Sequence, residues 1–305
     1  MVKKVMIIFN PSSGKSQSKK IAQQVQDYLE EQDSAYQVKQ MGTKSETDAT
    51  KFAKEAAENK FDLVVSIGGD GTISDVVSGL SPFEHRPKLG IIPAGTVNNL
   101  ARVLQIPLDI PAAIENLVTG DLTPLDVGQV NDSYMISTLT LGVLADAALE
   151  VSQQEKQKFG PFAFVFKGSK ILVQHKHYHL KIQHDEGKWR GSAQLLLVTM
   201  TNSAGGFPYL DPDAAVDDGY FHVFIVPELS FSGSLRFLPY FISGKAKKIP
   251  DVTYFKTKKL TIEGAKKEIR SRIDGDPSEK LPLNMQVLEG HIQVLAPYLN
   301  KRSQC

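Results

Sequence analysis

The sequence predicts two domains: a three-layer α/β domain followed by an antiparallel β-sandwich. In the first part of the chain, short apolar runs alternate with longer segments of helical spacing. Beyond residue 126 the runs become strand-like and are separated by turn signals. The chain has 305 residues, which is enough for two hydrophobic cores. We therefore expect an α/β domain at residues 1–126 and a β-sandwich at 127–296.

The first domain is expected to alternate strands with helices. Apolar runs predict strands at 5–9, 36–41, 61–67 and 89–92. Helical spacing predicts helices at 19–31, at 46–59, and in the residues that follow Thr72. This order is typical of a parallel sheet covered by helices on both faces. In such a sheet the functional loops follow the carboxyl ends of the strands.

The second domain is expected to consist mainly of strands. Strand-like runs lie at 129–130, 134–140, 178–183, 189–201, 220–226, 257–263, 267–273 and 286–295. Helical patterns interrupt them only at 145–154, 161–173 and 231–244. Many short strands separated by turns favour antiparallel pairing, and a cleft between the domains is the expected site.

Composition and charge restrict the classes of function. No apolar run approaches the roughly 20 residues needed to span a bilayer, and the first apolar run is too short for a signal peptide. A single cysteine, Cys305, fits a reducing cytoplasm. The net charge of +1 argues against nucleic acid as a partner. Residues 245–272 are locally basic, which is explained by solvated strand faces or by peripheral contact with an anionic membrane.

The most informative motif is the sequence Gly68-Gly69-Asp70-Gly71-Thr72, at the end of a buried-type strand. Glycines expose backbone N–H groups, and the following helix directs its positive end at the same place, so the motif is typical of a phosphate-binding loop. The alternative is a glycine-rich turn that serves packing only. Because a carboxylate beside a phosphate is repelled, Asp70 implies Mg²⁺ or a substrate hydroxyl.

Two further loops follow predicted strands of the first domain. The segment from Asn10 to Ser16 contains Gly-Lys-Ser, but Phe9 stands where a P-loop needs glycine. A structural turn and a binding loop are both compatible with it. The second segment, from Pro93 to Ala101, offers Gly95, Thr96 and Asn98, and it is compatible with a helix cap or with a ligand loop.

Together with the acidic segments Asp217-Asp218-Gly219 and Asp274-Gly275-Asp276, these loops resemble the diacylglycerol and sphingosine kinase superfamily, and most of all the soluble bacterial diacylglycerol kinases. The resemblance covers nearly the whole chain. It implies a nucleotide-binding domain like those of NAD kinase and phosphofructokinase, a tail at about 297–305 that returns to it, and MgATP in the cleft. It also implies phosphorylation of the hydroxyl of a diacylglycerol-like lipid, with a homodimer as an option.

The resemblance assigns roles to individual residues. Asp274 is the expected general base, Asp70 is its competitor, and Asp276 is a second catalytic carboxylate. The expected nucleotide-binding residues are Asn10, Pro11, Ser13, Gly68, Gly69, Gly71, Thr72, Gly95, Thr96 and Asn98. The expected Mg²⁺ ligands are Asp213, Asp217, Asp218 and Tyr220, although a hairpin turn explains Asp218-Gly219 without a metal.

Two positions depart from the family pattern. Asp276 stands where members usually carry glutamate, and Asn99 stands where bacterial diacylglycerol kinases commonly carry aspartate. These departures support one alternative, a nucleotide-binding module without enzymatic activity. A second alternative is a soluble kinase like NAD kinase, which shares the motif at residues 68–72 and the fold of the first domain.

Overall fold

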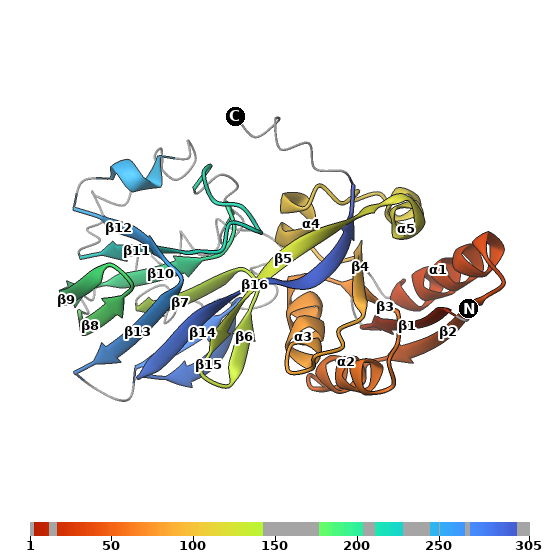
Figure 1. The fold of residues 1–305 in the computed structure, drawn as a ribbon, viewed down its shortest axis with the longest axis horizontal. Coiled ribbons are helices and arrows are strands. Elements are labelled where there is room, and N and C mark those ends of the chain that lie inside the picture. The colour runs from red at the N-terminus through yellow and green to blue at the C-terminus, as the bar shows by residue number, and fades with distance from the viewer. Residues whose placement is uncertain are drawn as a thin grey trace. The chain divides into compact units, whose positions relative to one another are not determined.

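A computed structural model describes residues 3–11, 17–142, 177–203, 211–227, 245–249, 251–265 and 269–297. The contacts divide the chain into two compact units (Figure 1). Unit 1 contains Met1–Val127 and the chain from Glu289 onward, and unit 2 is the segment Gly128–Leu288. Unit 2 is therefore an insertion into the sequence of unit 1. The expected return of the tail at 297–305 stays a prediction, because the description ends at residue 297.

Unit 1 is built on a parallel sheet. Its strands, in spatial order, are β2 (Tyr36–Gly42), β1 (Lys3–Phe9), β3 (Leu63–Gly68) and β4 (Lys88–Pro93). The carboxyl part of β16 (Leu283–Ala296) continues the sheet in parallel, with Val294 opposite Leu89. Asn116 fastens this strand, because its Nδ2 donates to the carbonyl of Leu295 at 3.0 Å. The predicted parallel α/β domain is confirmed.

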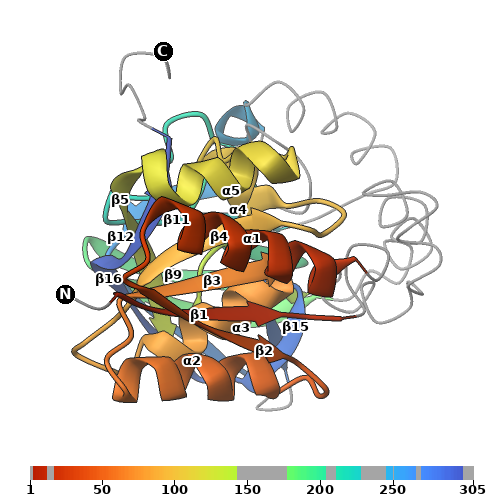
Figure 2. The ribbon, with the colours of Figure 1, turned by 90° about the vertical axis from the view of Figure 1, so that its right-hand side faces the viewer.

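Helices cover both faces of this sheet. Figure 2 shows α1 (Ser18–Gln32) and α5 (Ile110–Thr119) on one side, and α2 (Asp48–Glu58) and α3 (Asp70–Leu80) on the other. Successive side chains of a strand point to opposite faces. Val5 and Ile7 accordingly pack with Val25 of α1 in one buried cluster. The result is the predicted arrangement of three layers.

Unit 2 contains two antiparallel sheets. In one, the amino-terminal part of β16 pairs with β13 (Lys259–Gly264), followed by β8 (Tyr178–His184) and β9 (Gly187–Ala193). The other has the order β12 (Thr253–Thr257), β11 (Phe221–Val226), β10 (Leu195–Thr199), β7 (Thr138–Gly142), β14 (Arg270–Ile273) and β15 (Asp276–Lys280). Strands β5 (Asp121–Val130) and β6 (Ser133–Met135) pair with each other.

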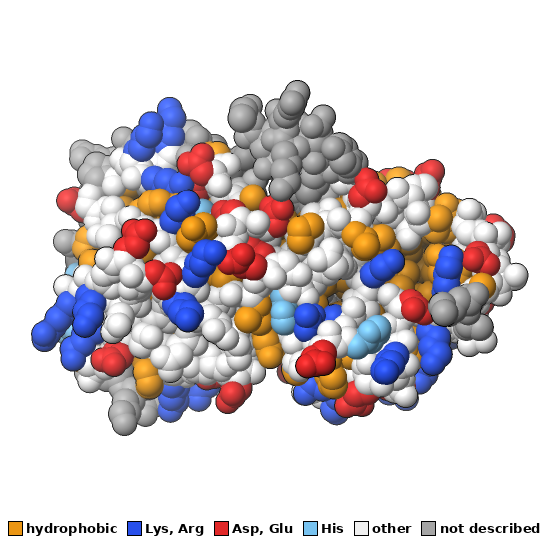
Figure 3. All heavy atoms as spheres, in the orientation of Figure 1, with side chains coloured by type: hydrophobic (Ala, Val, Ile, Leu, Met, Phe, Trp, Pro, Cys, Tyr) orange, Lys and Arg blue, Asp and Glu red, His pale blue; other side chains and the backbone are white. Residues whose placement is uncertain are grey.

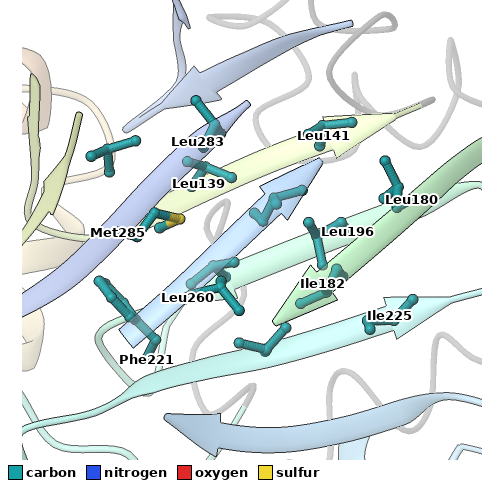
Figure 4. Packing of buried hydrophobic residues seen from close by; sticks show 14 of the residues in the cluster. Leu139, Leu141, Leu180, Ile182, Leu196, Phe221, Ile225, Leu260, Leu283 and Met285 are labelled. Carbon is teal, nitrogen blue, oxygen red and sulfur yellow. The ribbon is translucent and has the colours of Figure 1, made fainter. Parts of the chain in front are cut away.

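Side chains from both sheets of unit 2 meet in one apolar cluster. Figure 4 shows Leu180, Leu260 and Leu283 from the first sheet beside Leu139 and Leu196 from the second. All five are almost completely buried. Burial of a leucine side chain contributes about 1.5–3 kcal/mol, so this cluster is a substantial core. The predicted β-sandwich is confirmed.

Some element boundaries differ from the predicted ones. The runs at 134–140 and 189–201 were expected to be single strands, but each is two strands. The first run breaks because the N–H groups of Ile136 and Ser137 donate to a side chain instead of to a strand. Strands β12 and β15 and helix α5 were not predicted. The helices predicted at 145–154, 161–173 and 231–244 lie outside the described residues.

Candidate functional site

The strand register of unit 1 aligns the carboxyl ends of β1, β3 and β4 at one edge of the sheet. Phe9 lies opposite Ile67, Ile67 lies opposite Ile92, and Gly68 lies opposite Pro93. The loops that follow β1, β3 and β4 therefore begin at the same edge of the sheet. Asn10 and Pro11 begin the first of these loops, whereas Ser13 lies outside the described residues.

The loops after β3 and β4 are packed backbone against backbone. A Cβ at Gly95 would lie 2.4 Å from the Cα of Gly69, a distance that no side-chain movement can relieve. A Cβ at Gly68 would lie 2.4 Å from Oγ1 of Thr72. A Cβ at Gly71, in contrast, would meet no atom within 4 Å. Gly69 and Gly95 thus permit the contact between the loops, and Gly68 makes room for the threonine side chain.

Asp70 joins the two loops. One carboxylate oxygen accepts a hydrogen bond from the N–H of Asn99 at 3.0 Å, and the other accepts one from the N–H of Leu100 at 3.1 Å. These N–H groups begin α4 (Asn99–Val103), so the carboxylate lies at a helix start where negative charge is favourable. Asn99 takes part in this contact through its backbone N–H group. The departure from the family pattern at position 99 therefore leaves the contact intact.

Asn98 shapes the loop after β4 from within. Its φ of 54° is left-handed, a conformation that asparagine tolerates better than most residues. Its Oδ1 accepts from the N–H of Gly95 and its Nδ2 donates to the carbonyl of Gly95, both at 3.0 Å. Thr96, between them in sequence, is exposed. The side chain of Asn98 therefore holds a short loop that presents a threonine hydroxyl.

In unit 2, Asp274 lies in the turn between β14 and β15. It has a φ of 49° and Gly275 has a φ of 97°, while Ile273 pairs with Asp276. Positive φ at both central residues is characteristic of a type I′ hairpin turn, for which Asp-Gly is a preferred sequence. The strand predicted at 267–273 ends, as β14 does, directly before Asp274, and Asp274 itself lies in the turn.

The carboxylate of Asp274 is held by three consecutive backbone groups. It accepts hydrogen bonds from the N–H groups of Ile136 at 3.0 Å, Ser137 at 2.9 Å and Thr138 at 2.9 Å. Hydrogen bonds to the ionised form of a carboxyl group favour that form. The contact also fixes the turn against the start of β7.

A second group of polar residues in unit 2 surrounds His222 of β11. Its Nδ1 lies 2.9 Å from Asp211 and its Nε2 lies 2.8 Å from Asp218. The Nζ of Lys247 lies 2.6 Å from Asp211 and 3.0 Å from Asp213. Tyr254 completes the group, which we call the charged network, by donating its hydroxyl to Asp211 at 3.1 Å. Asp211, His222, Lys247 and Tyr254 were not predicted; the one available signal was a histidine within an apolar strand.

The ionisation of the charged network is coupled. Burial opposes a charge on Asp211, but the hydrogen bonds from His222 and Lys247 outweigh it and lower its pKa to about 2. Burial likewise opposes a charge on His222, but Asp211 and Asp218 raise its pKa above the usual value. The pKa of Tyr254 is raised to about 12, chiefly by burial. The network therefore combines an ionised Asp211 with a cationic Lys247 at neutral pH.

Two of the predicted Mg²⁺ ligands, Asp213 and Asp218, belong to the charged network. Carboxylate oxygens suit Mg²⁺ chemically. However, Asp218 accepts from the N–H groups of Ala215 and Tyr220 and pairs with His222, and Asp213 pairs with Lys247. Within the described ranges, no three His, Cys, Asp or Glu side chains converge so that they could hold a metal. These acids contact N–H groups, His222 and Lys247, and their assignment as Mg²⁺ ligands stays a prediction.

Comparison with known proteins gives one consistent result. The model of the diacylglycerol kinase catalytic domain matches residues 4–130, and that of the YegS C-terminal NAD kinase beta sandwich-like domain matches residues 137–296. The diacylglycerol kinase of Staphylococcus epidermidis is 37% identical over 297 residues, which cover 97% of this chain and 93% of the relative. That of Staphylococcus saprophyticus is 36% identical and covers 97% of this chain and 96% of the relative.

A solved structure agrees with these relatives. A diacylglycerol kinase from Bacillus anthracis superposes with a TM-score of 0.79 at 28% identity, over 96% of this chain and 97% of that one. The match in sequence and in fold extends over both units. The chain therefore belongs to the diacylglycerol kinase family.

Proposed function

We propose that this protein is an ATP-dependent lipid kinase that transfers the γ-phosphoryl group of ATP to the hydroxyl of a diacylglycerol-like lipid. The product is a lipid of the phosphatidic acid type. The observation that carries the proposal is the joined pair of loops at the edge of the unit 1 sheet, in a chain 37% identical to diacylglycerol kinases over nearly its whole length. Phosphoryl transfer depends mainly on positioning and electrostatics, which such loops provide.

The nucleotide is bound at the edge of the unit 1 sheet. The N–H groups of residues 68–72 and the start of α3 provide donors and a positive helix end for phosphate oxygens. Asn10, Pro11, Ser13, Thr96 and Asn98 belong to the loops on either side. In this proposal Asp70 acts as a positioning residue, since both its oxygens hold the loop that carries Thr96. Mg²⁺ bound with ATP would offset charge on the transferring group.

Asp274 is our proposed general base, and Asp276 in the same hairpin is a second carboxylate beside it. Three N–H donors hold the carboxylate of Asp274 in one orientation, and the ionised carboxylate is the form that accepts a proton. Asp274→Asn should therefore lower kcat about 10²- to 10⁴-fold with little change in KM for ATP. A variant with near-normal kcat would contradict this assignment and return the role to Asp70, which Asp70→Asn would then test.

Contact with an anionic membrane is the proposed way in which the enzyme reaches its lipid. Within the part of the chain that the structure describes, no helix is long and apolar enough to cross a bilayer. On the face seen in Figure 3, Lys and Arg side chains are interspersed with Asp and Glu. The Nζ atoms of exposed Lys256 and Lys258 lie 4.5 and 5.3 Å from the centroid of the Tyr220 ring, which combines positive charge with an aromatic ring. Sedimentation with phosphatidylglycerol vesicles, compared with phosphatidylcholine vesicles, tests this contact.

The activity itself is tested by transfer of radiolabelled phosphate from ATP. The acceptors to compare are diacylglycerol, a sphingosine-like base, a monoacylglycerol and NAD, with the lipids in detergent micelles. We expect labelling of diacylglycerol. Transfer to NAD alone would favour the soluble-kinase alternative, and ATP binding without transfer to any acceptor would favour a module without enzymatic activity.

A further inference from the structure

Arg272 is a buried cation that the proposed mechanism has not used. It lies on β14, two residues before Asp274, and its side chain and backbone together are only 8% exposed. Its Nε donates to the carbonyl oxygen of Gly275 at 2.9 Å, and Nη2 donates to the same oxygen. Within the described residues no carboxylate lies in ion-pair distance of the guanidinium, and Asp276 acts on it only from farther away.

The register shows where this guanidinium lies in unit 2. Ile273 and Leu139 belong to the buried cluster between the sheets, so Arg272 and its partner Thr140 face the other side of the second sheet. Thr138 follows on the same face of β7, and both threonines are half-buried. Arg272 therefore lies beside two hydroxyl-bearing side chains and next to the turn that contains the proposed base.

Burial of this charge calls for a compensating group. An arginine stays protonated in proteins, and an isolated buried charge is unfavourable unless it is paired. Burial lowers the pKa of Arg272, which reflects the same lack of compensation. Holding one carbonyl oxygen needs only a neutral donor, so the bond to Gly275 does not explain why the residue is a cation. The planar guanidinium has five N–H donors and binds phosphate oxygens in a bidentate manner.

We propose that Arg272 is a phosphate-binding residue of unit 2, assisted by the hydroxyls of Thr138 and Thr140. This inference rests on the proposed lipid kinase function and adds a residue that recognises the phosphoryl group. Gly275 fixes one edge of the guanidinium, and the other edge binds phosphoryl oxygens. The phosphate belongs either to ATP or to the phosphorylated lipid, and the kinetic experiment distinguishes these sources.

The test compares Arg272→Gln and Arg272→Lys with Arg270→Gln. Arg270 is an exposed arginine two residues earlier on the same strand, which makes it a matched control. We expect Arg272→Gln to lower kcat/KM about 10²-fold or more, as the loss of a charged transition-state donor does. Arg272→Lys should keep part of the activity, and Arg270→Gln should stay near wild type. A raised KM for ATP identifies the nucleotide phosphate, and weaker inhibition by added phosphatidic acid identifies the lipid phosphate.

A direct binding measurement separates this inference from the proposed function. Calorimetric titration of the full chain with inorganic pyrophosphate should give weaker binding for Arg272→Gln than for wild type, whether or not any lipid is phosphorylated. If Arg272→Gln has unchanged pyrophosphate affinity and unchanged kcat/KM but a lower melting temperature, the proposal is wrong. Arg272 then only stabilises the turn that contains Gly275. If Arg272→Gln does not fold, Arg272→Lys decides by the same measurements, because it keeps the charge but loses the bidentate geometry.

Discussion

The loops of unit 1 and the charged network of unit 2 are two polar regions held together by different forces. In unit 1 the backbones of Gly69 and Gly95 approach each other, and the carboxylate of Asp70 is held by backbone N–H groups. In unit 2, Asp211 and His222 are held by charged or ionisable side chains. The contact between the unit 1 loops depends on the absence of side-chain volume at Gly69 and Gly95. The charged network depends on the ionisation of its side chains. The two regions should therefore respond to different perturbations.

The largest expected effect is on the charged network. Asp211→Asn removes a fully buried carboxylate and leaves His222 and Lys247 without their shared partner. Loss of one member of a buried ion pair typically lowers the free energy of unfolding by about 3–5 kcal/mol. Chemical denaturation measures it. The control is Asp213→Asn, because Asp213 also contacts Lys247 but its side chain is 83% exposed, and we expect a change below about 1 kcal/mol. Equal losses in both variants would contradict the conclusion that the buried carboxylate of Asp211 holds the charged network together.

A smaller effect should follow from added volume in unit 1. In Gly95→Ala the new methyl group would lie 2.4 Å from the Cα of Gly69, so the two loops must separate. Overpacking of this kind typically lowers the free energy of unfolding by about 1–3 kcal/mol. Gly71→Ala is the control, since its methyl group meets nothing within 4 Å and lies in helix α3. There we expect a gain of about 0.5–1 kcal/mol, because alanine favours a helix over glycine. Identical melting curves for the two variants would show that the loops are not in tight contact.

The smallest effect is the pH dependence contributed by two histidines, one in each unit. The pKa of His222 is raised, so its stabilising contribution is full below about pH 6.5 and is lost as the pH rises through the higher folded value. The pKa of His291 is lowered by burial and by nearby Arg86, against the opposing bond to the Ser81 carbonyl. Its contribution has the opposite sign, because stability falls as the pH drops below about 6.5.

Replacement of each histidine by glutamine separates the two contributions. Denaturant unfolding at pH 5.5 and pH 8.5 should show that His222→Gln loses more stability, relative to wild type, at the lower pH. His291→Gln should lose more at the higher pH. The same pH profile in both variants would mean that the two sites do not differ in the way that their contacts indicate.

Much of unit 1 could be predicted from the sequence because its signals are local. The apolar runs before Asn10 and Gly68 have the length of buried strands, and glycine and proline mark where they end. Parallel strands then place those ends at one edge, so the grouping of the loops followed from the fold class. The hydrogen bonds of Asp70 could not be predicted, since they depend on how α4 begins after the turn at Asn98.

The contacts in unit 2 were less accessible to prediction. Asp211 and His222 lie close in sequence, but Lys247 comes much later. The pairing of β11 with β12 and the course of the chain before β11 bring the three together. The strand predicted at 267–273 placed Asp274 just past a strand end, but its contact with the start of β7 depends on the order of the strands in the sheet.

Strand β16 has a consequence for how the protein is made. Its 14 residues begin in unit 2 and end beside β4 in unit 1. A ribosome therefore completes all of unit 2 before it releases the strand that covers the edge of β4. Until then the nascent unit 1 exposes unpaired backbone groups at that edge, which is the feature that promotes aggregation of incomplete sheets. Expression fragments that stop before residue 289 should also tend to aggregate, because they lack the strand that pairs with β4. The amino-terminal domain is therefore best studied within the full chain.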